Sequence, residues 1–398
     1  MFSMLEGEKK FGVAATNGVH WHNNRRFTLR HLRDLGMGKS TIVSAIQHEA
    51  EEFVITMKDQ AGTSAPLPKS LIPAIINVLW QMVASKRYDI NDQELLNIHN
   101  VLHEFRENFP SMMIIDIFPW VKNIFPEFFL NLITKKDKNT NLSRLLESKL
   151  KKLVDDHVET LDVNNSRDYI DEYLIEMEKK KDDPDSTMSI KDLVTCIADL
   201  LGAGLDTTSI SITWGIFYLT SFPEVQTKLQ KEIDEVIPKG TLISLEHKSR
   251  LPYTEAFLAE VLRYSSLAAF GAFHSVSTDT KFSGYTIPKG SVVAPMYASV
   301  HFDPKYFPSP NEFKPERFLS SEGKFENPKE GFFPFGNGKR QCLGESLARI
   351  QLFIFLVTMV QELHFSPPPN KTLDLSPLDI PLFHQPKANQ DILITIRS

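Results

Sequence analysis

The segment that most constrains this chain runs from Ser189 to Thr220, because it is the longest stretch whose apolar residues recur with helical spacing. A helix that is apolar on most sides is buried in a core, so this segment predicts a central helix. Its middle contains the sequence AGLDTT, in which Asp206 precedes Thr207 and Thr208. These polar groups cost stability in a buried helix unless something polar binds there. The alternative is a polar patch of the core in which the threonines bond back to their own helix.

The rest of the chain is mostly helical in pattern. A proline- and phenylalanine-rich stretch, 302–337, has no period, and such long irregular segments in compact domains usually carry function. Residues 286–293 predict a turn into a strand of a small sheet, and 392–396 predict another short strand. Helical periodicity predicts further helices near 21–35, 41–53, 71–85, 92–105, 145–161, 223–237, 253–264 and 343–363. We therefore expect a mainly α protein with a minor β region.

Composition excludes several classes of protein. The 398 residues allow two or three domains or one large one. A net charge of −6 argues against nucleic acid as the main partner. Two cysteines, Cys196 and Cys342, exclude a disulfide scaffold and a cysteine-rich zinc site; a single bridge is allowed, but reduced thiols are favoured. No signal peptide is evident, and the apolar stretch 71–84 is too short to span a bilayer, so the chain alone predicts a soluble protein inside the cell.

The most informative motif is FGNGKRQCLG at residues 335–344. Gly336 and Gly338 permit a tight backbone close to something flat or bulky. Cys342 follows Arg340 by two residues and directly precedes an apolar helix, a position that favours the thiolate form of a cysteine. A single thiolate suits haem iron, because the macrocycle supplies the in-plane ligands. The alternative is a buried cysteine after a glycine turn.

This segment resembles the haem-binding signature of the cytochromes P-450, Phe-x-x-Gly-x-Arg-x-Cys-x-Gly, and every fixed position is present. The resemblance implies that the cofactor is haem (heme b) and that the Cys342 thiolate binds its iron. It also implies that Arg340 pairs with a haem propionate and that Phe335 packs beneath the porphyrin and tunes the environment of the sulfur. Gly336 and Gly344 belong to the same cofactor-binding loop.

The AGLDTT sequence resembles the oxygen-activation motif of the same family. By this resemblance Gly204 leaves room for dioxygen, Thr207 hydrogen-bonds the oxygen under activation or its water, and Asp206 helps to relay protons. Proton delivery to a buried site requires such a series of titratable and hydroxyl groups.

Two further motifs match propionate-binding positions of the family. Trp21 and Arg25 lie four residues apart on the first predicted helix, where they would donate to a propionate. The alternative for them is a surface cation–π or packing pair. His274, before the predicted turn and strand, matches another propionate donor.

Glu260 and Arg263 lie three residues apart on one predicted helix and resemble the Glu-x-x-Arg motif of the family. At the surface such a pair would contribute little. In the family it instead forms a buried network with the arginine of a Pro-Glu-Arg-Phe segment, which is Arg317 here. The resemblance implies that this network is structural and holds the loop that carries the cysteine.

The resemblance implies the P-450 fold, as a single haem domain over 18–398 after a residual N-terminal segment, 1–17. It implies a haem-thiolate monooxygenase that inserts one oxygen atom from O2 into a hydrophobic substrate: a steroid, juvenoid, fatty acid or xenobiotic. Electrons would come from an NADPH-dependent flavoprotein reductase, with cytochrome b5 as a second donor, on the cytosolic face of the endoplasmic reticulum membrane. A catalytically silent remnant and a haem-thiolate isomerase stay open as alternatives. Short stretches of the sequence, 166–171 and 338–345, resemble animal microsomal family-2 members and suggest an arthropod source.

The resemblance also predicts how this chain differs from the family and which of its residues contact the substrate, the membrane and a reductase. Microsomal members carry an anchor helix and early strands before the position of Gly18, so we expect a shortened chain whose sheet near 291–296 exposes an edge. Residues 112–129 predict a buried loop, or else a mobile lid or membrane-touching segment. The residues expected to contact substrate are Ala203, Leu267, Phe270 and Phe383. The residues expected to dock a reductase, or else to form a solvated face, are Arg26, Arg30, Arg33 and Lys339.

Overall fold

The protein is described by a computed structural model that covers residues 10–34, 40–89, 92–118, 120–378, 383–387 and 389–397. The chain divides into two compact units. The first unit comprises Met1–Glu49 and Lys69–Asp206, and the second comprises Ala50–Pro68 and Thr207–Ser398. Two helices, α3 (Ser40–Asp59) and α10 (Ile190–Ser221), contribute residues to both units.

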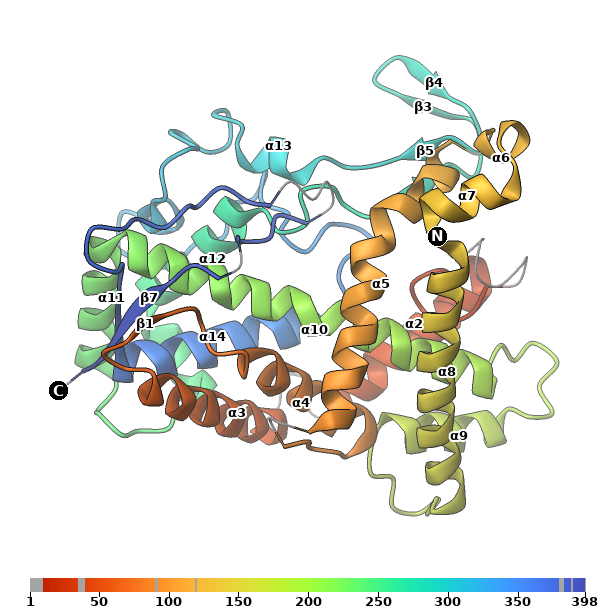
Figure 1. The fold of residues 1–398 in the computed structure, drawn as a ribbon, viewed down its shortest axis with the longest axis horizontal. Helices are drawn as coiled ribbons and strands as arrows, with labels where there is room; N and C mark the ends of the chain where they lie inside the picture. Colours follow the sequence, from red (N-terminus) through yellow and green to blue (C-terminus); the bar gives the residue numbers. More distant parts are fainter. Residues whose placement is uncertain are drawn as a thin grey trace. The chain divides into compact units, whose positions relative to one another are not determined.

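The first unit is helical in its described part (Figure 1). Helices α4 and α8 both pack against α9, whose residues Tyr169 and Tyr173 are fully buried. Helix α5 lies beside α8. Besides its parts of α3 and α10, the unit contains α2 (Gly18–Asp34), α4 (Leu71–Ala84), α5 (Gln93–Ile117), α6 (Val121–Ile124), α7 (Glu127–Thr134), α8 (Lys136–Glu159) and α9 (Tyr169–Lys179).

The second unit combines helices with small sheets. Helix α12 packs against α11, α14 and the 3-10 turn η2, and the core includes Phe257, Phe318 and Phe353. The helical elements are α11 (Pro223–Val236), η1 (Leu245–Arg250), α12 (Pro252–Ser265), α13 (Tyr297–His301), η2 (Pro315–Phe318) and α14 (Glu345–Glu362). The strands are β1 (Ser64–Ala65), β2 (His274–Ser275), β3 (Thr280–Phe282), β4 (Tyr285–Ile287), β5 (Val292–Val293), β6 (Leu363–Ser366) and β7 (Ile392–Ile396).

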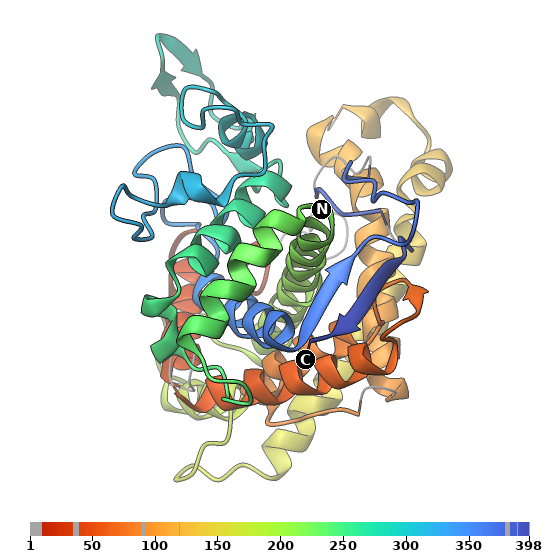
Figure 2. The same ribbon diagram turned by 90° about the vertical axis from the view of Figure 1, so that its left-hand side faces the viewer.

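All the strand pairs are antiparallel. Strand β7 is central in the order β1-β7-β6, with Leu363 opposite Ile396, and Figure 2 shows β6 and β7 as neighbouring arrows. Strand β2 pairs with β5, and β3 pairs with β4. The β3–β4 connection is Ser283-Gly284, and both residues have positive φ, 47° and 85°. Two successive residues with positive φ favour a tight turn whose twist matches that of the flanking strands.

The mainly α architecture with a minor β region is confirmed, and β7 matches the predicted strand 392–396. The loop interpretation of 112–129 is wrong. Helix α5 continues to Ile117, through Pro110, and α6 and α7 follow. Aromatic and proline residues made this stretch look irregular, but tertiary packing overrides such weak local preferences. Helix α9 was not predicted, and the expected end of the first helix at 36–38 lies outside the described residues.

Helix α10 is long and apolar enough to cross a membrane by length and composition alone. Half of its most apolar window is buried within the protein, and core helices of soluble proteins meet the same criterion. Its polar residues Thr208, Ser209 and Ser211 are buried as well. The helix therefore fits the central buried segment expected from the sequence.

Candidate active site

Cys342 lies in a tight loop directly before α14. Gly336 and Gly338 have φ of 75° and 80°, which residues with a Cβ rarely adopt. The Cys342 N–H donates to the Phe335 carbonyl at 2.8 Å, and the Gln341 N–H donates to the Gly338 carbonyl at 3.1 Å. These bonds close the loop so that Cys342 is exposed three residues before Glu345, the first residue of α14.

Phe335, at the start of this loop, is held by a residue that the sequence analysis missed. The guanidinium carbon of Arg349 lies 4.9 Å from the centroid of the Phe335 ring. Its Nε donates to Oε1 of Glu345 at 2.9 Å, one turn earlier on α14. A glutamate four residues before an arginine on a helix is a recognisable stabilising pair, and it is the signal that could have identified Arg349.

The groups around Cys342 fit a haem iron. The thiol is exposed before an apolar helix, and Arg340 precedes it by two residues; a helix N-terminus and nearby cations favour the thiolate form of a cysteine. Within the described ranges, the one group of three residues able to share a metal ion lies in the first unit and lacks cysteine. A single exposed thiolate suits a macrocycle-bound iron better than a metal centre built from side chains alone.

The structure brings Glu260, Arg263 and Arg317 together, and the first two are fully buried. Arg263 donates from Nε and Nη2 to the two oxygens of Glu260, at 2.6 and 2.8 Å. Oε1 of Glu260 also accepts from Arg317 Nε at 3.1 Å and from the Lys314 N–H at 2.8 Å. Arg317 donates further to the Pro308 carbonyl at 2.8 Å. A buried charge network is stable only when its donors and acceptors are satisfied in this way.

His301, which the sequence analysis also missed, connects this network to the cysteine loop. Arg263 donates to the His301 carbonyl at 2.8 Å, and the Phe333 N–H donates to His301 Nε2 at 3.0 Å. Nε2 is therefore unprotonated, and Nδ1 donates to the Ser266 hydroxyl at 2.8 Å. Burial, and then the charge of Arg263, lower the pKa of His301 to about 4. The neutral ring thus fixes the backbone at Phe333, two residues before Phe335. No local sequence pattern predicts this role of His301.

On α10, Ala203 is exposed, whereas Gly204, Asp206 and Thr207 are half-buried. A Cβ on Gly204 would lie 3.1 Å from Leu79 Cδ2 of α4, so packing alone already favours glycine there. The Thr207 carbonyl accepts from the Ser211 hydroxyl at 2.8 Å. Back-bonding hydroxyls therefore occur on this helix, as the core-patch alternative supposed.

The remaining candidates lie on separate elements. Trp21 and Arg25 are half-buried on α2, and the Arg25 guanidinium carbon is 5.8 Å from the Trp21 ring centroid, a cation–π distance. His274 is exposed within strand β2, opposite Val293 of β5, the strand that follows the predicted turn.

Two of the candidate substrate residues of the second unit, Leu267 and Phe383, lie on segments that are joined by a hydrogen bond. The His384 N–H donates to the Leu267 carbonyl at 2.9 Å, which places the segment of Phe383 beside Leu267. Leu267, Phe270 and Phe383 are all half-buried. Apolar side chains that are neither buried nor fully exposed suit a hydrophobic binding surface.

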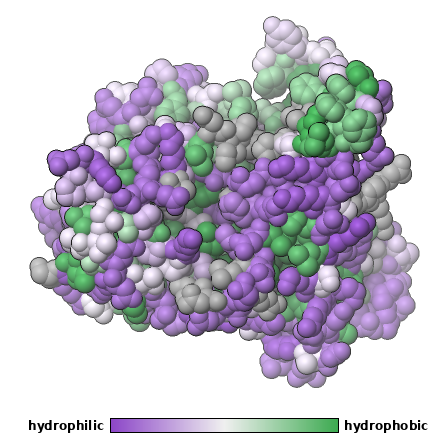
Figure 3. Space-filling view, viewed as in Figure 1, coloured by the Kyte–Doolittle hydropathy of each residue, from purple (hydrophilic) through white to green (hydrophobic). Residues whose placement is uncertain are grey.

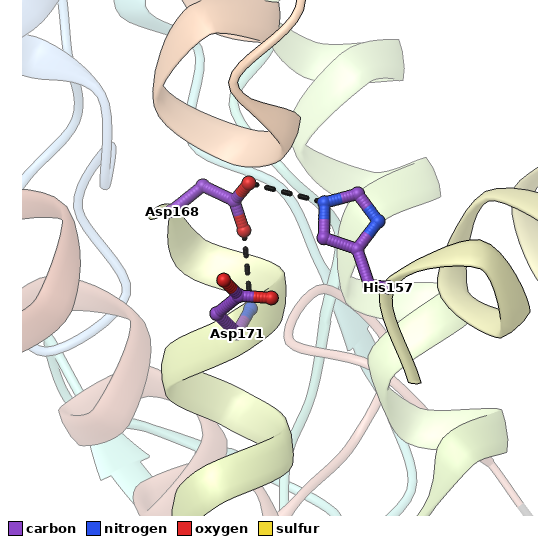
Figure 4. A group of neighbouring side chains, drawn as sticks. All are labelled: His157, Asp168 and Asp171. Atoms are coloured by element: carbon purple, nitrogen blue, oxygen red, sulfur yellow. Dashed lines mark hydrogen bonds and ion pairs between the residues drawn. The ribbon is translucent and has the colours of Figure 1, made fainter. Parts of the chain in front are cut away.

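The group of possible metal ligands is His157, Asp168 and Asp171, shown in Figure 4. Both ring nitrogens of His157 face acceptors: Nδ1 is 2.7 Å from the Leu153 carbonyl, and Nε2 is 3.1 Å from Asp168 Oδ2. The other oxygen of Asp168 caps α9 by accepting from the Asp171 N–H at 3.1 Å. Both oxygens of Asp171 accept from Arg167, at 2.6 and 2.8 Å. This arrangement forms a helix cap with ion pairs rather than a metal centre.

Comparison with known proteins identifies the family. The sequence profile of the cytochrome P450 family matches residues 2–392. Cytochrome P450 2L1 of Panulirus argus is 43% identical over 396 residues, which cover 98% of this chain and 80% of that protein. Human cytochrome P450 2C8 is 39% identical over 358 residues, 89% of this chain and 71% of that protein. Rabbit (Oryctolagus cuniculus) cytochrome P450 2B4 is 36% identical over 392 residues, which cover 96% of this chain and 76% of that protein. This chain therefore belongs to the cytochrome P450 family, as a haem-thiolate monooxygenase that acts on hydrophobic substrates.

Proposed function

We propose that Cys342 is the iron ligand of this monooxygenase, and that the chain works at the endoplasmic reticulum membrane with a flavoprotein reductase and cytochrome b5 as electron donors. The observation that carries the assignment of Cys342 is the geometry of its loop. Two glycines with positive φ and the bond from Cys342 to Phe335 present an exposed thiol at the start of α14. The proposed domain is the single haem domain over 18–398.

Once bound, the haem supplies the iron at which dioxygen is reduced and from which one oxygen atom reaches the substrate. The chain would hold it through the Cys342 thiolate, with Arg340 and the pair Trp21 and Arg25 as donors to the propionates. His274 is a further proposed donor. Phe335, Gly336 and Gly344 form the surrounding loop.

Proton delivery is assigned to α10. Asp206 and Thr207 are consecutive and half-buried, so the Asp206 carboxylate can exchange protons with solvent and the Thr207 hydroxyl can pass them inward. The proposed role of Gly204 is to keep the position of dioxygen free of a side chain. The apolar residues Leu267, Phe270 and Phe383, with Ala203, exclude water and position the substrate.

The first test is the absorption spectrum of the reduced protein with carbon monoxide. We expect a strongly red-shifted Soret band, lost in Cys342→Ser. The chain offers a matched control, because its other cysteine, Cys196, is buried in α10; Cys196→Ala should keep the band. A wild-type protein without haem would favour the silent remnant, and turnover without a reductase would favour the isomerase. Steroids, juvenoids, fatty acids and xenobiotics are the substrate classes to screen.

The proposed reductase-docking face is the row Arg26, Arg30 and Arg33, all exposed on α2. Lys339, exposed in the cysteine loop, is the fourth proposed contact. A row of cations steers an acidic partner in a salt-dependent way. Arg30→Glu should slow reduction by the reductase at low salt, whereas Lys231→Glu, at an exposed position on α11, should not. Equal rates for both variants would remove this assignment.

The proposed membrane contact is an apolar patch on α6 and α7 and the residues beside them, visible as the green area at the upper right of Figure 3. Phe128 and Leu132 are 75% and 73% exposed. The other members are Phe118, Trp120, Ile124, Phe125 and Ile133. Aromatic and aliphatic side chains flanked by lysines, such as the exposed Lys122 and Lys135, suit the headgroup boundary of a bilayer.

A flotation assay with vesicles of neutral and anionic phospholipids tests this patch. The double variant Phe128→Ser with Leu132→Ser should release protein from the vesicles. The matched control is Leu145→Ser with Val158→Ser, which changes two exposed apolar residues of α8 outside the patch. Equal binding by both double variants would contradict the assignment.

A further inference from the structure

The first turn of α10 holds a buried carboxylate that the sequence analysis did not single out. Asp192 is only 1% exposed. Its Oδ1 accepts from the Gly12 N–H at 3.1 Å, from Asn24 Nδ2 at 3.1 Å and from His20 Nε2 at 2.7 Å. Its Oδ2 accepts from the Ser189 hydroxyl at 3.0 Å. One side chain thus joins three segments of the first unit.

The segment before α2 is shaped to reach this carboxylate. Gly12 has φ of 79°, and a Cβ there would lie 2.4 Å from Asp199 Oδ2 and 2.7 Å from Thr195 Cγ2, so no other residue fits without displacement. The Gly12 carbonyl accepts from Asn24 Nδ2 at 2.8 Å and from the Thr16 hydroxyl at 2.6 Å. Asn24 therefore ties α2 both to Asp192 and to the segment that precedes α2.

A second carboxylate of α10, that of Asp199, binds the same segment. Asp199 Oδ2 accepts from the Val13 N–H at 2.8 Å and from the Ala14 N–H at 2.9 Å. The two aspartates therefore bind different sets of groups. Asp199 holds the preceding segment, and Asp192 holds α2 as well.

The residues that Asp192 grips on α2 lie next to the proposed propionate donors. His20 and Asn24 are four residues apart, and Trp21 and Arg25 follow each of them by one position. Successive residues of an α-helix are about 100° apart around its axis. A helix held at two points one turn apart can neither roll nor slide without breaking both bonds, so the grip on His20 and Asn24 sets the direction of Trp21 and Arg25.

We propose that Asp192 is a positioning residue for the cofactor: it fixes α2 so that Trp21 and Arg25 meet the haem propionates. This rests on the proposed role of those two residues. Asp192 itself does not touch the cofactor. Partners that orient cofactor-binding residues commonly change cofactor affinity by tenfold or more, so loss of Asp192 should speed haem release on the order of tenfold.

The experiment measures the rate of haem transfer from the purified holoenzyme to excess apomyoglobin. Asp192→Ala should release haem on the order of tenfold faster than wild type. It should keep the red-shifted Soret band with carbon monoxide, because Cys342 is unchanged. Asp199→Ala is the matched control, since it also removes a carboxylate of α10 that grips residues before α2, and it should release haem more slowly than Asp192→Ala.

A double-variant cycle separates positioning from a general loss of structure. If Asp192 acts through Arg25, then Asp192→Ala should add little to the haem loss of Arg25→Leu. Full additivity of the two effects would overturn the proposal, as would wild-type haem release by Asp192→Ala. If Asp192→Ala does not fold, His20→Leu and Asn24→Ser each remove one bond to Asp192 and enter the same cycle, with the same outcomes. A wild-type chain that takes up no haem would overturn the proposed function together with this inference, whereas normal uptake with unchanged release overturns the inference alone.

Discussion

Each unit of this protein buries a histidine, and the surroundings of the two rings shift their pKa values in opposite directions. In the first unit, burial lowers the pKa of His157, but its hydrogen bonds to Asp168 and to the Leu153 carbonyl outweigh burial and raise it overall. In the second unit, burial and the charge of Arg263 lower the pKa of His301 to about 4. Each nitrogen of the first ring faces an acceptor, which favours its charged form, and the second is a neutral ring that accepts from a backbone N–H.

The difference shows that burial alone does not set the charge of a histidine. The groups facing each ring do so, because they decide whether its second proton has an acceptor. The charged ring closes a helix cap at α9, far along the chain from the cysteine loop. The neutral ring stands between the Glu260 network and the residues that precede Cys342, which is why its tautomer bears on the active site.

Removing Glu260, the counterion of Arg263, should have the largest effect on the free energy of unfolding. Glu260→Ala leaves Arg263, which is fully buried, without its carboxylate. Breaking a buried ion pair in this way costs about 3–5 kcal/mol in the free energy of unfolding. Urea denaturation measures it. Glu235→Ala changes an exposed glutamate in a loose pair on α11 and should cost less than about 0.5 kcal/mol. Similar costs for the two variants would show that the network is not structural.

Replacing the neutral ring itself should come next. His301→Leu removes the acceptor for the Phe333 N–H and the partner of the Ser266 hydroxyl. An unsatisfied donor inside the protein costs about 1–3 kcal/mol, and the Phe333 N–H is the donor that loses its acceptor. The cysteine loop should loosen too, so a smaller share of the reduced protein should show the red-shifted band with carbon monoxide. Full retention of that band would separate His301 from the loop.

The third prediction concerns pH. His301 titrates near 6.5 when unfolded but near 4 when folded, so its stabilising contribution is present above about pH 6.5 and is lost as pH falls towards 4. His157, with a raised pKa, contributes below about pH 6.5 and loses that contribution as pH rises through its folded value. Unfolding free energies at several pH values should therefore change more steeply on the acid side in wild type than in His301→Leu. Parallel curves would contradict the assigned states.

The smallest effect is expected at His157. His157→Gln should cost about 1 kcal/mol below pH 6, where the charged ring contributes, and less above pH 7. Because every carboxylate oxygen of Asp168 and Asp171 already accepts a hydrogen bond within the protein, Zn2+ should leave the melting temperature of wild type unchanged. A rise in that temperature with Zn2+ would identify a metal site instead of a cap.

Much of the fold could be predicted because its signals are local. Helical periodicity located α10, α11 and α12 within a residue or two at each end. The resemblance to the family's Glu-x-x-Arg and Pro-Glu-Arg-Phe motifs also anticipated that Glu260, Arg263 and Arg317 would meet. Helices α5 to α7 were misjudged because proline and aromatic residues suggest irregular structure, whereas packing against neighbours sustains a helix through them.

The sequence by itself determined the family, the candidate iron ligand Cys342 and the mainly helical architecture. Each of these depends on residue types at short fixed spacings. Only the tertiary structure decided that His301 is neutral, that the surroundings of His157 favour its charged form and that Asp192 bonds to α2. Each of these depends on groups brought together from distant parts of the chain: Asp192 meets His20 across 172 positions, and His301 meets Phe333 across 32. Hydrogen bonds and charges act over a few ångströms of space, and spacing along the chain does not reveal such proximity.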